Sequence, residues 1–122
     1  MSVYAFNIAR RYGKTVIAHR LATQGFLDRT PVYFYHISDR SKAIFDERYS
    51  PSFHSLAGRI AVGDIPSNSV LIVDNVMHAA DVSDMNDICK TLTSRGCTVL
   101  LFGTQIEDIE VDHMVTIRAN DL

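Results

Sequence analysis

The 122-residue sequence contains two cysteines, no run of 18 apolar residues and no excess of basic residues. A membrane-spanning helix needs about 20 consecutive apolar residues, so no membrane partner is expected. The N-terminus lacks the charged region, apolar core and cleavage site of a signal peptide, which favours the cytoplasm. A net charge of −2 argues against an extended nucleic-acid-binding surface, so any role with nucleic acid is expected to be indirect.

Metal and nucleophile signatures are also scarce. Cys89 and Cys97 lie eight residues apart without a Cys-x-x-Cys pair, which predicts two reduced, buried thiols rather than a zinc site. No Gly-x-Ser-x-Gly turn supports a serine hydrolase. The histidines form no spaced ligand set, and each is predicted to be a surface or half-buried residue: His19, His36, His54, His78 and His113.

What the sequence does contain is an alternation of apolar runs and helical patterns. Buried strands are predicted at 3–8, 31–37, 69–74 and 97–103, with a shorter last strand at 112–117. Helices are predicted at 15–24, at 42–48 behind a Ser38 or Asp39 cap, and from Ser83 or Asp84 to a stop at Gly96. The segment 49–68 has a looser pattern, with a short helix or edge strand expected near 57–62.

This alternation predicts a single α/β domain spanning residues 1–122. Strands that alternate with helices form parallel β-α-β units, because a parallel connection needs a crossover. The continuous apolar run at 69–74 suits a central strand that is covered on both faces. We therefore expect a three-layer sandwich around a mostly parallel central sheet of about five strands.

The strongest chemical signal is Gly13-Lys14-Thr15, between the first predicted strand and the first predicted helix. A phosphate-binding loop needs this context, because backbone N–H groups of the turn and helix N-terminus face the phosphates. Lys14 would reach the β- and γ-phosphates, and the Thr15 hydroxyl would hold Mg²⁺. The full pattern begins with a glycine that falls at position 8, where this chain has Ile8.

Polar residues also follow the other predicted strands. Asp39 follows the second strand, Asp74 closes the third after four apolar residues, and Thr104 and Gln105 follow the fourth. In open α/β sheets, ligands bind at the carboxyl ends of the strands. These residues are therefore expected to converge near Lys14.

The segments 9–15, 70–75 and 100–105 together resemble P-loop NTPases of the additional-strand (RecA-like) division. The loop 9–15 is most similar to the deviant phosphate loop of viral DNA-packaging terminase ATPases. Those loops often lack the first glycine and carry an arginine where Arg10 stands. The resemblance thus implies a viral protein of the host cytoplasm, with ATP and Mg²⁺ as cofactors.

The resemblance also implies roles for individual residues. Nucleotide would contact the whole loop, whose residues are Arg10, Arg11, Tyr12, Gly13, Lys14 and Thr15. Arg11 is equally compatible with a solvated position. Thr15 and Asp74 would hold Mg²⁺, and Gln105, with Thr104 sharing the role, would sense the γ-phosphate.

One position departs from the resemblance. Relatives carry glutamate where this chain has Asn75, and an asparagine cannot accept a proton from the attacking water. Other RecA-like proteins take the catalytic glutamate from the end of the second strand, which makes Asp39 the candidate base. We therefore expect slow or partner-dependent ATP hydrolysis, with Lys14, Asp39 and Gln105 as catalytic candidates and a protein partner or a homo-oligomer.

Two other functions remain open. A degenerate P-loop fold that serves only protein–protein interaction would explain Ile8 and Asn75. A nucleoside kinase is the weaker alternative, because the segment order is also similar to thymidine kinases. Those enzymes carry glutamate at the position of Asn75 and a zinc-bearing lid that this chain lacks.

Overall fold

The computed structural model describes residues 2–9, 13–23, 29–36, 38–74, 82–104, 106 and 108–117. The strands are β1 (Val3–Ile8), β2 (Val32–His36), β3 (His54–Ala57), β4 (Val70–Asp74), β5 (Thr98–Gly103) and β6 (His113–Ile117). The helices are α1 (Lys14–Thr23), α2 (Asp39–Tyr49) and α3 (Val82–Ser94), with a 3₁₀ turn, η2 (Val62–Asp64). None of the helices in these described ranges is long and apolar enough to span a membrane.

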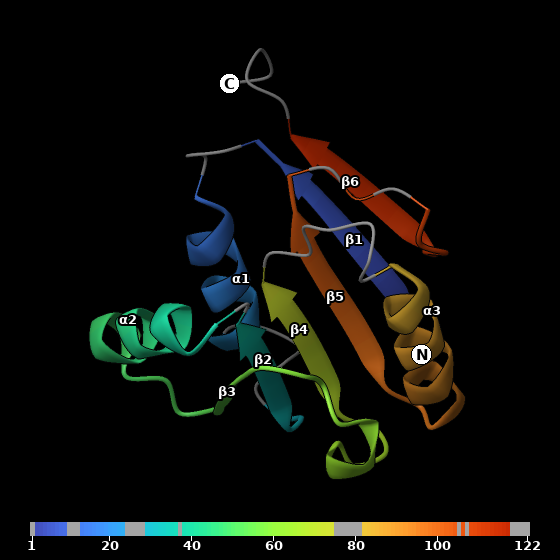
Figure 1. The fold of residues 1–122 in the computed structure, drawn as a ribbon, viewed down its shortest axis with the longest axis horizontal. Helices are drawn as coiled ribbons and strands as arrows, with labels where there is room; N and C mark the ends of the chain where they lie inside the picture. The colour runs from blue at the N-terminus through green and yellow to red at the C-terminus, as the bar shows by residue number, and fades with distance from the viewer. Residues whose placement is uncertain are drawn as a thin grey trace.

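The six strands form one sheet in the order β3-β2-β4-β5-β1-β6 (Figure 1). Every neighbouring pair in this sheet is parallel, so the carboxyl ends of all six strands lie along the same edge. The predicted α/β class is confirmed, but the sheet has six strands where the sequence predicts about five. The additional one is β3, at the edge, within the segment whose sequence pattern is loose.

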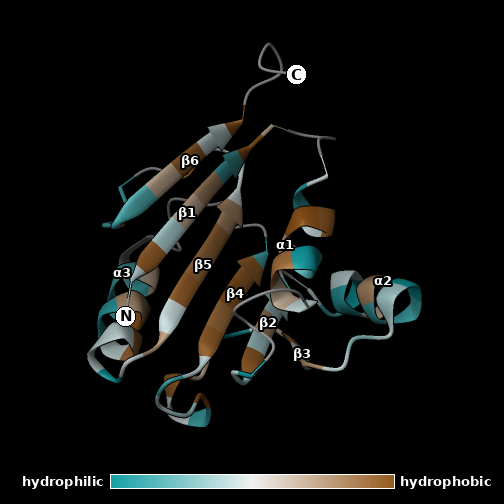
Figure 2. Ribbon diagram, turned by 180° about the vertical axis from the view of Figure 1, so that it is seen from behind, coloured by the Kyte–Doolittle hydropathy of each residue, from teal (hydrophilic) through white to brown (hydrophobic). Residues whose placement is uncertain are grey.

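Helices cover both faces of the sheet (Figures 1 and 2). Ala18 and Ala22 of α1 and Phe45 of α2 pack on the face that carries Phe34 and Ile72. On the opposite face, α3 contributes three buried residues to a second core cluster: Met85, Cys89 and Leu92. The 3₁₀ turn η2 packs beside α3. The described elements therefore form three layers with a core on each side of the sheet.

The two central strands are buried on both faces. All five residues of β4 are buried, and so are five of the six residues of β5. Figure 2 shows both strands in the hydrophobic colour along most of their length. The edge strand β6 differs, because Met114 and Val115 are both exposed. Continuous apolar runs thus mark central parallel strands, as the pattern predicts.

Local signals determine where the helices begin and end. The Ser38 hydroxyl accepts a hydrogen bond of 3.1 Å from the Ser41 N–H and so caps α2. After α3, Gly96 has φ +81°, and the Cys97 N–H donates to the Leu92 carbonyl at 3.0 Å. Gly96 thus follows the helix end, as predicted, in a conformation that glycine adopts without strain.

The two cysteines are free and buried, which confirms their predicted state. Burial raises the pKa of the Cys89 thiol to about 12, so this thiol is protonated at neutral pH. The Cys97 thiol donates to the Pro66 carbonyl at 3.3 Å. Both side chains belong to the core under α3 and serve packing.

Candidate functional site

The turn into α1 places Gly13-Lys14-Thr15 at the carboxyl edge of the sheet. Lys14 is the first residue of α1, and the Gly13 carbonyl accepts the Ile17 N–H at 2.8 Å, which closes the first helical turn. Gly13 has φ +77°, a left-handed conformation that favours glycine. The first N–H groups of a helix have no partner within it, so the start of α1 offers donors to an anion.

Thr15 and Asp74 are brought together by this arrangement. The Thr15 Oγ1 donates a hydrogen bond of 2.8 Å to Asp74 Oδ2, across 59 residues of sequence. Asp74 is the last residue of β4, and α1 packs beside β4 and β5. The two predicted Mg²⁺ ligands are therefore direct neighbours.

The Asp74 carboxylate is buried without full compensation. Asp74 is 8% exposed, and its Oδ1 has no hydrogen-bond partner among the residues that the structure describes. Burial raises the pKa of Asp74, whereas the Thr15 hydrogen bond and the nearby Lys14 and His36 lower it. A buried carboxylate with an orphaned oxygen is costly, and a cation would offset that cost.

This donor set fits Mg²⁺ better than a metal held by protein alone. Among the described residues, no group of three or more His, Cys, Asp or Glu side chains is arranged to hold a metal ion. Mg²⁺ in nucleotide sites uses one or two protein oxygens and takes its other ligands from phosphates and water. The Asp74 carboxylate and the Thr15 hydroxyl supply such oxygens, and Lys14 supplies positive charge for phosphate.

His36 also lies near Asp74, and the sequence does not predict this. The sequence predicts a surface or half-buried residue, but His36 is only 4% exposed, at the end of β2. Phe34 and His36 are two residues apart on one strand, so they share a face, and their rings lie 4.8 Å apart. The alternation Phe34–His36 is the available signal, because it carries the buried face to the end of the strand.

His36 also makes a polar contact with the neighbouring strand β3. The His36 Nε2 lies 3.1 Å from the Ser55 hydroxyl of β3. Near Ser55, Asp46 of α2 pairs with Lys42 at 2.5 Å. The Lys42 hydrogen bond, and after it Ser55, lower the pKa of Asp46. A polar strip therefore runs from Asp74 through His36 to the corner formed by β3 and α2.

Two other predicted residues that the structure describes, Asp39 and Thr104, lie apart from this cluster. Asp39 is the first residue of α2 and is exposed, and within the described ranges no contact links it to Thr15 or Asp74. Thr104 is exposed immediately after β5. The remaining predicted residues lie outside the described residues: Arg10, Arg11, Tyr12, Asn75 and Gln105.

The comparisons with known proteins give no match: no family model, no curated protein and no solved structure is significantly similar to this chain. The case for a function therefore comes from the geometry around Thr15 and Asp74.

Proposed function

We propose that this chain is a Mg²⁺-dependent ATP-binding P-loop domain and a weak or partner-dependent ATPase of the RecA-like, terminase-like type. The observation that carries the proposal is the Thr15–Asp74 hydrogen bond of 2.8 Å, together with the buried Asp74 Oδ1, which has no hydrogen-bond partner in the described part of the chain. Both proposed metal ligands meet beside Lys14 and the start of α1. An aspartate that served only a structural role at a strand end would be expected to have both buried oxygens hydrogen-bonded.

The strand order supports this assignment. β5 lies between β1, which leads to Gly13-Lys14-Thr15, and β4, which ends in Asp74. An additional strand therefore separates the phosphate-binding and metal-binding elements. All strands are parallel, so both elements end at the same edge of the sheet, where ligands of open α/β sheets bind.

The residues divide the work of binding phosphate and metal. The N–H groups at the start of α1 and the Lys14 ammonium would neutralise the triphosphate. Thr15 and Asp74 would hold Mg²⁺, which bridges phosphate oxygens and stabilises the charge that develops during phosphoryl transfer. Phosphoryl transfer depends mainly on positioning and charge neutralisation, so these few groups suffice for binding and for slow turnover.

Slow turnover follows from the residues that would handle the attacking water. Asn75 cannot accept a proton, and the exposed Asp39 makes no contact with Thr15 or Asp74 in the described part of the chain. A water-orienting group must then come from Gln105, from a protein partner or from a second copy of this chain. Hydrolysis should therefore be slow for the isolated domain and faster in the complete assembly.

One observation favours the alternative of a degenerate fold that serves protein interaction. Ile8, at the position of the first glycine, is 0% exposed and belongs to the core on the α1 face. The chain thus uses that position for packing, and its phosphate loop starts later than in the full pattern. In this alternative, Thr15 and Asp74 would form only a structural hydrogen bond.

A matched pair of Thr15 variants separates the two functions. Thr15→Ser keeps the hydroxyl, whereas Thr15→Val keeps the shape and removes the oxygen. We expect calorimetry with a slowly hydrolysed ATP analogue to show Mg²⁺-dependent binding in wild type and Thr15→Ser, weakened about tenfold or more in Thr15→Val. Absence of binding by the wild-type protein at millimolar Mg²⁺ and analogue would select the interaction module.

A further inference from the structure

The connection between β5 and β6, residues 104–112, crosses one face of the sheet, and none of its described residues is helical. β1 pairs in parallel with both β5 and β6, so the chain must return from the carboxyl edge to the amino edge of the sheet. Ile106 and Ile109 are buried in the core cluster on the α3 face. The connection is therefore packed against the α3 face of the sheet.

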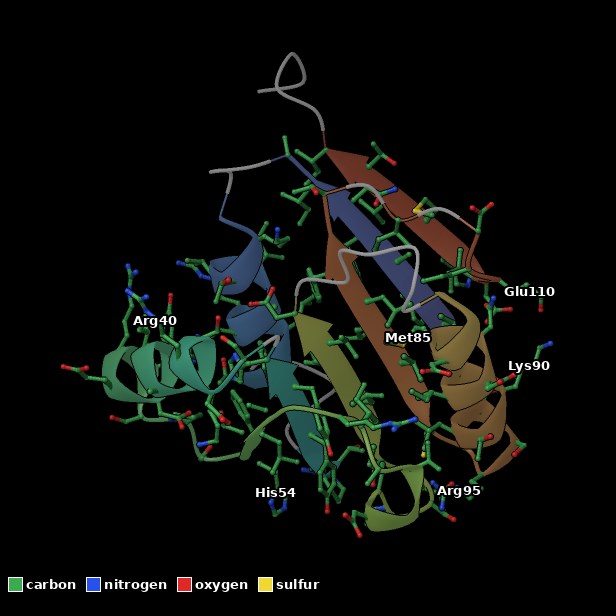
Figure 3. All side chains as sticks on the ribbon, in the orientation of Figure 1. Arg40, His54, Met85, Lys90, Arg95 and Glu110 are labelled. Carbon is green, nitrogen blue, oxygen red and sulfur yellow. The ribbon has the colours of Figure 1, made fainter. Side chains whose placement is uncertain are left out.

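Two asparagines hold this connection by the same kind of hydrogen bond. Asn7 Oδ1, on β1, accepts the Ile106 N–H at 2.6 Å. Asn86 Oδ1, on α3, accepts the Glu110 N–H at 2.9 Å. The two bonds lie at different ends of the connection, because Ile106 follows the carboxyl end of β5 closely, whereas Glu110 lies beside the amino end of β6 (Figure 3).

Asn7 belongs to the strand that leads to the phosphate loop. It pairs with Gly103, the last residue of β5. Val3, Ala5 and Asn7 alternate along β1 and so share a face, and Val3 and Ala5 are buried in the cluster on the α3 face. The Asn7 side chain therefore joins the end of β1 to the turn that follows β5, through the backbone of Ile106.

This turn begins between the two elements of the proposed nucleotide site. β5 lies between β1, which leads to Lys14, and β4, which ends in Asp74 (Figure 1). Asp74 pairs with Phe102, and Thr104 is exposed immediately after the end of β5. Phosphates bound by Lys14 and a Mg²⁺ ion bound by Asp74 would bring the terminal phosphate to this part of the carboxyl edge.

We propose that Asn7 is a positioning residue of the nucleotide site: by holding the Ile106 N–H, it fixes the turn after β5, whose polar groups bind the terminal phosphate of ATP. The inference rests on the proposed nucleotide function. A turn that is held on a rigid strand keeps its polar groups in place before the ligand arrives, which lowers the ordering cost of binding. ADP lacks the terminal phosphate, so its binding would not depend on Asn7.

The test compares the affinities for Mg-ADP and for the Mg²⁺ complex of a slowly hydrolysed ATP analogue, both by calorimetry. The ratio of the two dissociation constants measures the contribution of the terminal phosphate. Asn7→Leu keeps the branched shape of the side chain and removes the oxygen that accepts from Ile106. Asn86→Leu is the matched control, because it removes an asparagine–backbone hydrogen bond from the same connection, near Glu110.

A second control separates the two ends of the Asn7 side chain. Asn7 Nδ2 donates to Met114 Sδ on β6 at 3.2 Å, and Asn7→Leu removes this contact as well. Met114→Leu removes the sulfur and keeps an apolar side chain of similar size. An effect that comes from Asn7 Oδ1 should therefore be absent from Met114→Leu.

We expect wild type to bind the ATP analogue more tightly than ADP. Asn7→Leu should weaken binding of the analogue about tenfold and leave ADP affinity within about threefold of wild type. Asn86→Leu and Met114→Leu should keep the wild-type ratio within about threefold.

Three results would overturn the inference. The first is a wild-type ratio in folded Asn7→Leu or, if that variant does not fold, in Asn7→Ala, which adds no apolar branch. The second is an equal loss of affinity for ADP and for the analogue, which indicates a purely structural role. The third is a loss of the ratio in Asn86→Leu as large as that in the Asn7 variant.

The same titrations distinguish failure of this inference from failure of the proposed function. A wild-type protein that binds neither nucleotide overturns both. A wild-type protein that binds both nucleotides equally, or whose preference for the analogue does not depend on Asn7, overturns only the role of Asn7 and leaves the proposed nucleotide site intact.

Discussion

Thr15 donates a hydrogen bond of 2.8 Å to Asp74, joining the first turn of α1 to the end of β4 across 59 residues of sequence. The carboxylate is nevertheless buried, and its other oxygen has no hydrogen-bond partner within the described ranges. Thr15 therefore compensates only part of the cost of burying this charge. Sites that bind ligands commonly retain such local instability, because the ligand supplies the missing interaction.

Replacing Asp74 with asparagine should separate stability from function. The new amide would still accept the Thr15 hydrogen bond through its carbonyl oxygen, and the substitution would remove a buried charge. We expect the free energy of unfolding to be unchanged or higher by about 1 kcal/mol, while Mg²⁺-dependent nucleotide binding is lost. Urea denaturation and calorimetry measure the two effects. A destabilisation of several kcal/mol in Asp74→Asn would show that the carboxylate is structural.

Gly13 and Gly96 both have left-handed backbone conformations, with φ +77° and +81°. An added Cβ at Gly13 would make only an ordinary contact of 3.9 Å with the Val16 Cβ, so the cost of Gly13→Ala is mainly backbone strain. Gly13→Ala should lose about 1–2 kcal/mol of unfolding free energy. Gly96→Ala should lose more, because its added Cβ would also clash with the Asn68 side chain. Only Gly13→Ala should also weaken nucleotide binding, because Gly96 lies at the far end of α3. Equal binding by the two variants would contradict a role for the turn at Gly13.

Stability should fall as the pH drops below about 6.5, because protonation of the partly buried His19 and the buried His36 is less favourable in the folded state. Burial lowers the pKa of His19, and the charge of Arg20 lowers it further. Burial also lowers the pKa of His36. A lowered histidine pKa means that the unfolded chain binds more protons, so stability rises with pH through this window and is lost below it. Denaturant midpoints should therefore be lower at pH 5.5 than at pH 7.5.

The contribution of His19 can be isolated, since its ring stacks on Tyr49 at 4.2 Å and meets Phe45 edge-on. His19→Phe keeps an aromatic ring in this contact and removes the titration. The midpoint of this variant should change less between pH 7.5 and pH 5.5 than the wild-type midpoint. A wild-type midpoint that is constant over this range would contradict the lowered pKa values of His19 and His36.

Because β4 is central and β6 is at the edge of the sheet, replacing a side chain by alanine should cost more stability in β4 than in β6. Leu71 of β4 is 0% exposed, whereas Met114 of β6 is 44% exposed. Leu71→Ala should lose about 2–5 kcal/mol of unfolding free energy, because it leaves a cavity in the core. Met114→Ala should change the unfolding free energy by about 0.5 kcal/mol or less. Similar losses in the two variants would show that β6 is covered in solution.

The central strands and their parallel direction can be predicted from the sequence, because each strand is an apolar run and helical patterns separate these runs. β1 has the predicted bounds, and β4 and β5 differ from prediction by one residue at the start. For the loose segment the sequence predicts only a short helix or edge strand near 57–62, whereas the structure has the edge strand β3 at His54–Ala57 and the 3₁₀ turn η2 at Val62–Asp64. β3 is four residues long and has no buried residue. Short, half-exposed strands form mainly because a neighbouring edge offers hydrogen bonds, which no local pattern records.

Only the residues of the candidate site that belong to a sequence motif can be predicted from the sequence. Gly13-Lys14-Thr15 and the apolar run before Asp74 put the proposed ligands on the right elements, and the structure joins Thr15 to Asp74. The burial of His36 is missed because histidine alone carries no spacing signal, and its partner Ser55 lies on a strand that is distant in the sequence. The place of Asp39 after the second strand favours it as a base, and this role stays a prediction, with Asp39 exposed as the first residue of α2.

Calorimetric titration with a slowly hydrolysed ATP analogue, with and without Mg²⁺, tests the central claim most directly. It should be run on wild type, Lys14→Ala and the control Lys90→Ala, whose ammonium lies on α3, 4.0 Å from Glu110 and exposed (Figure 3). We expect Mg²⁺-dependent binding in wild type and Lys90→Ala, and a loss of about tenfold or more in Lys14→Ala. No binding by wild type, or equal binding by both lysine variants, would contradict a phosphate site at Lys14.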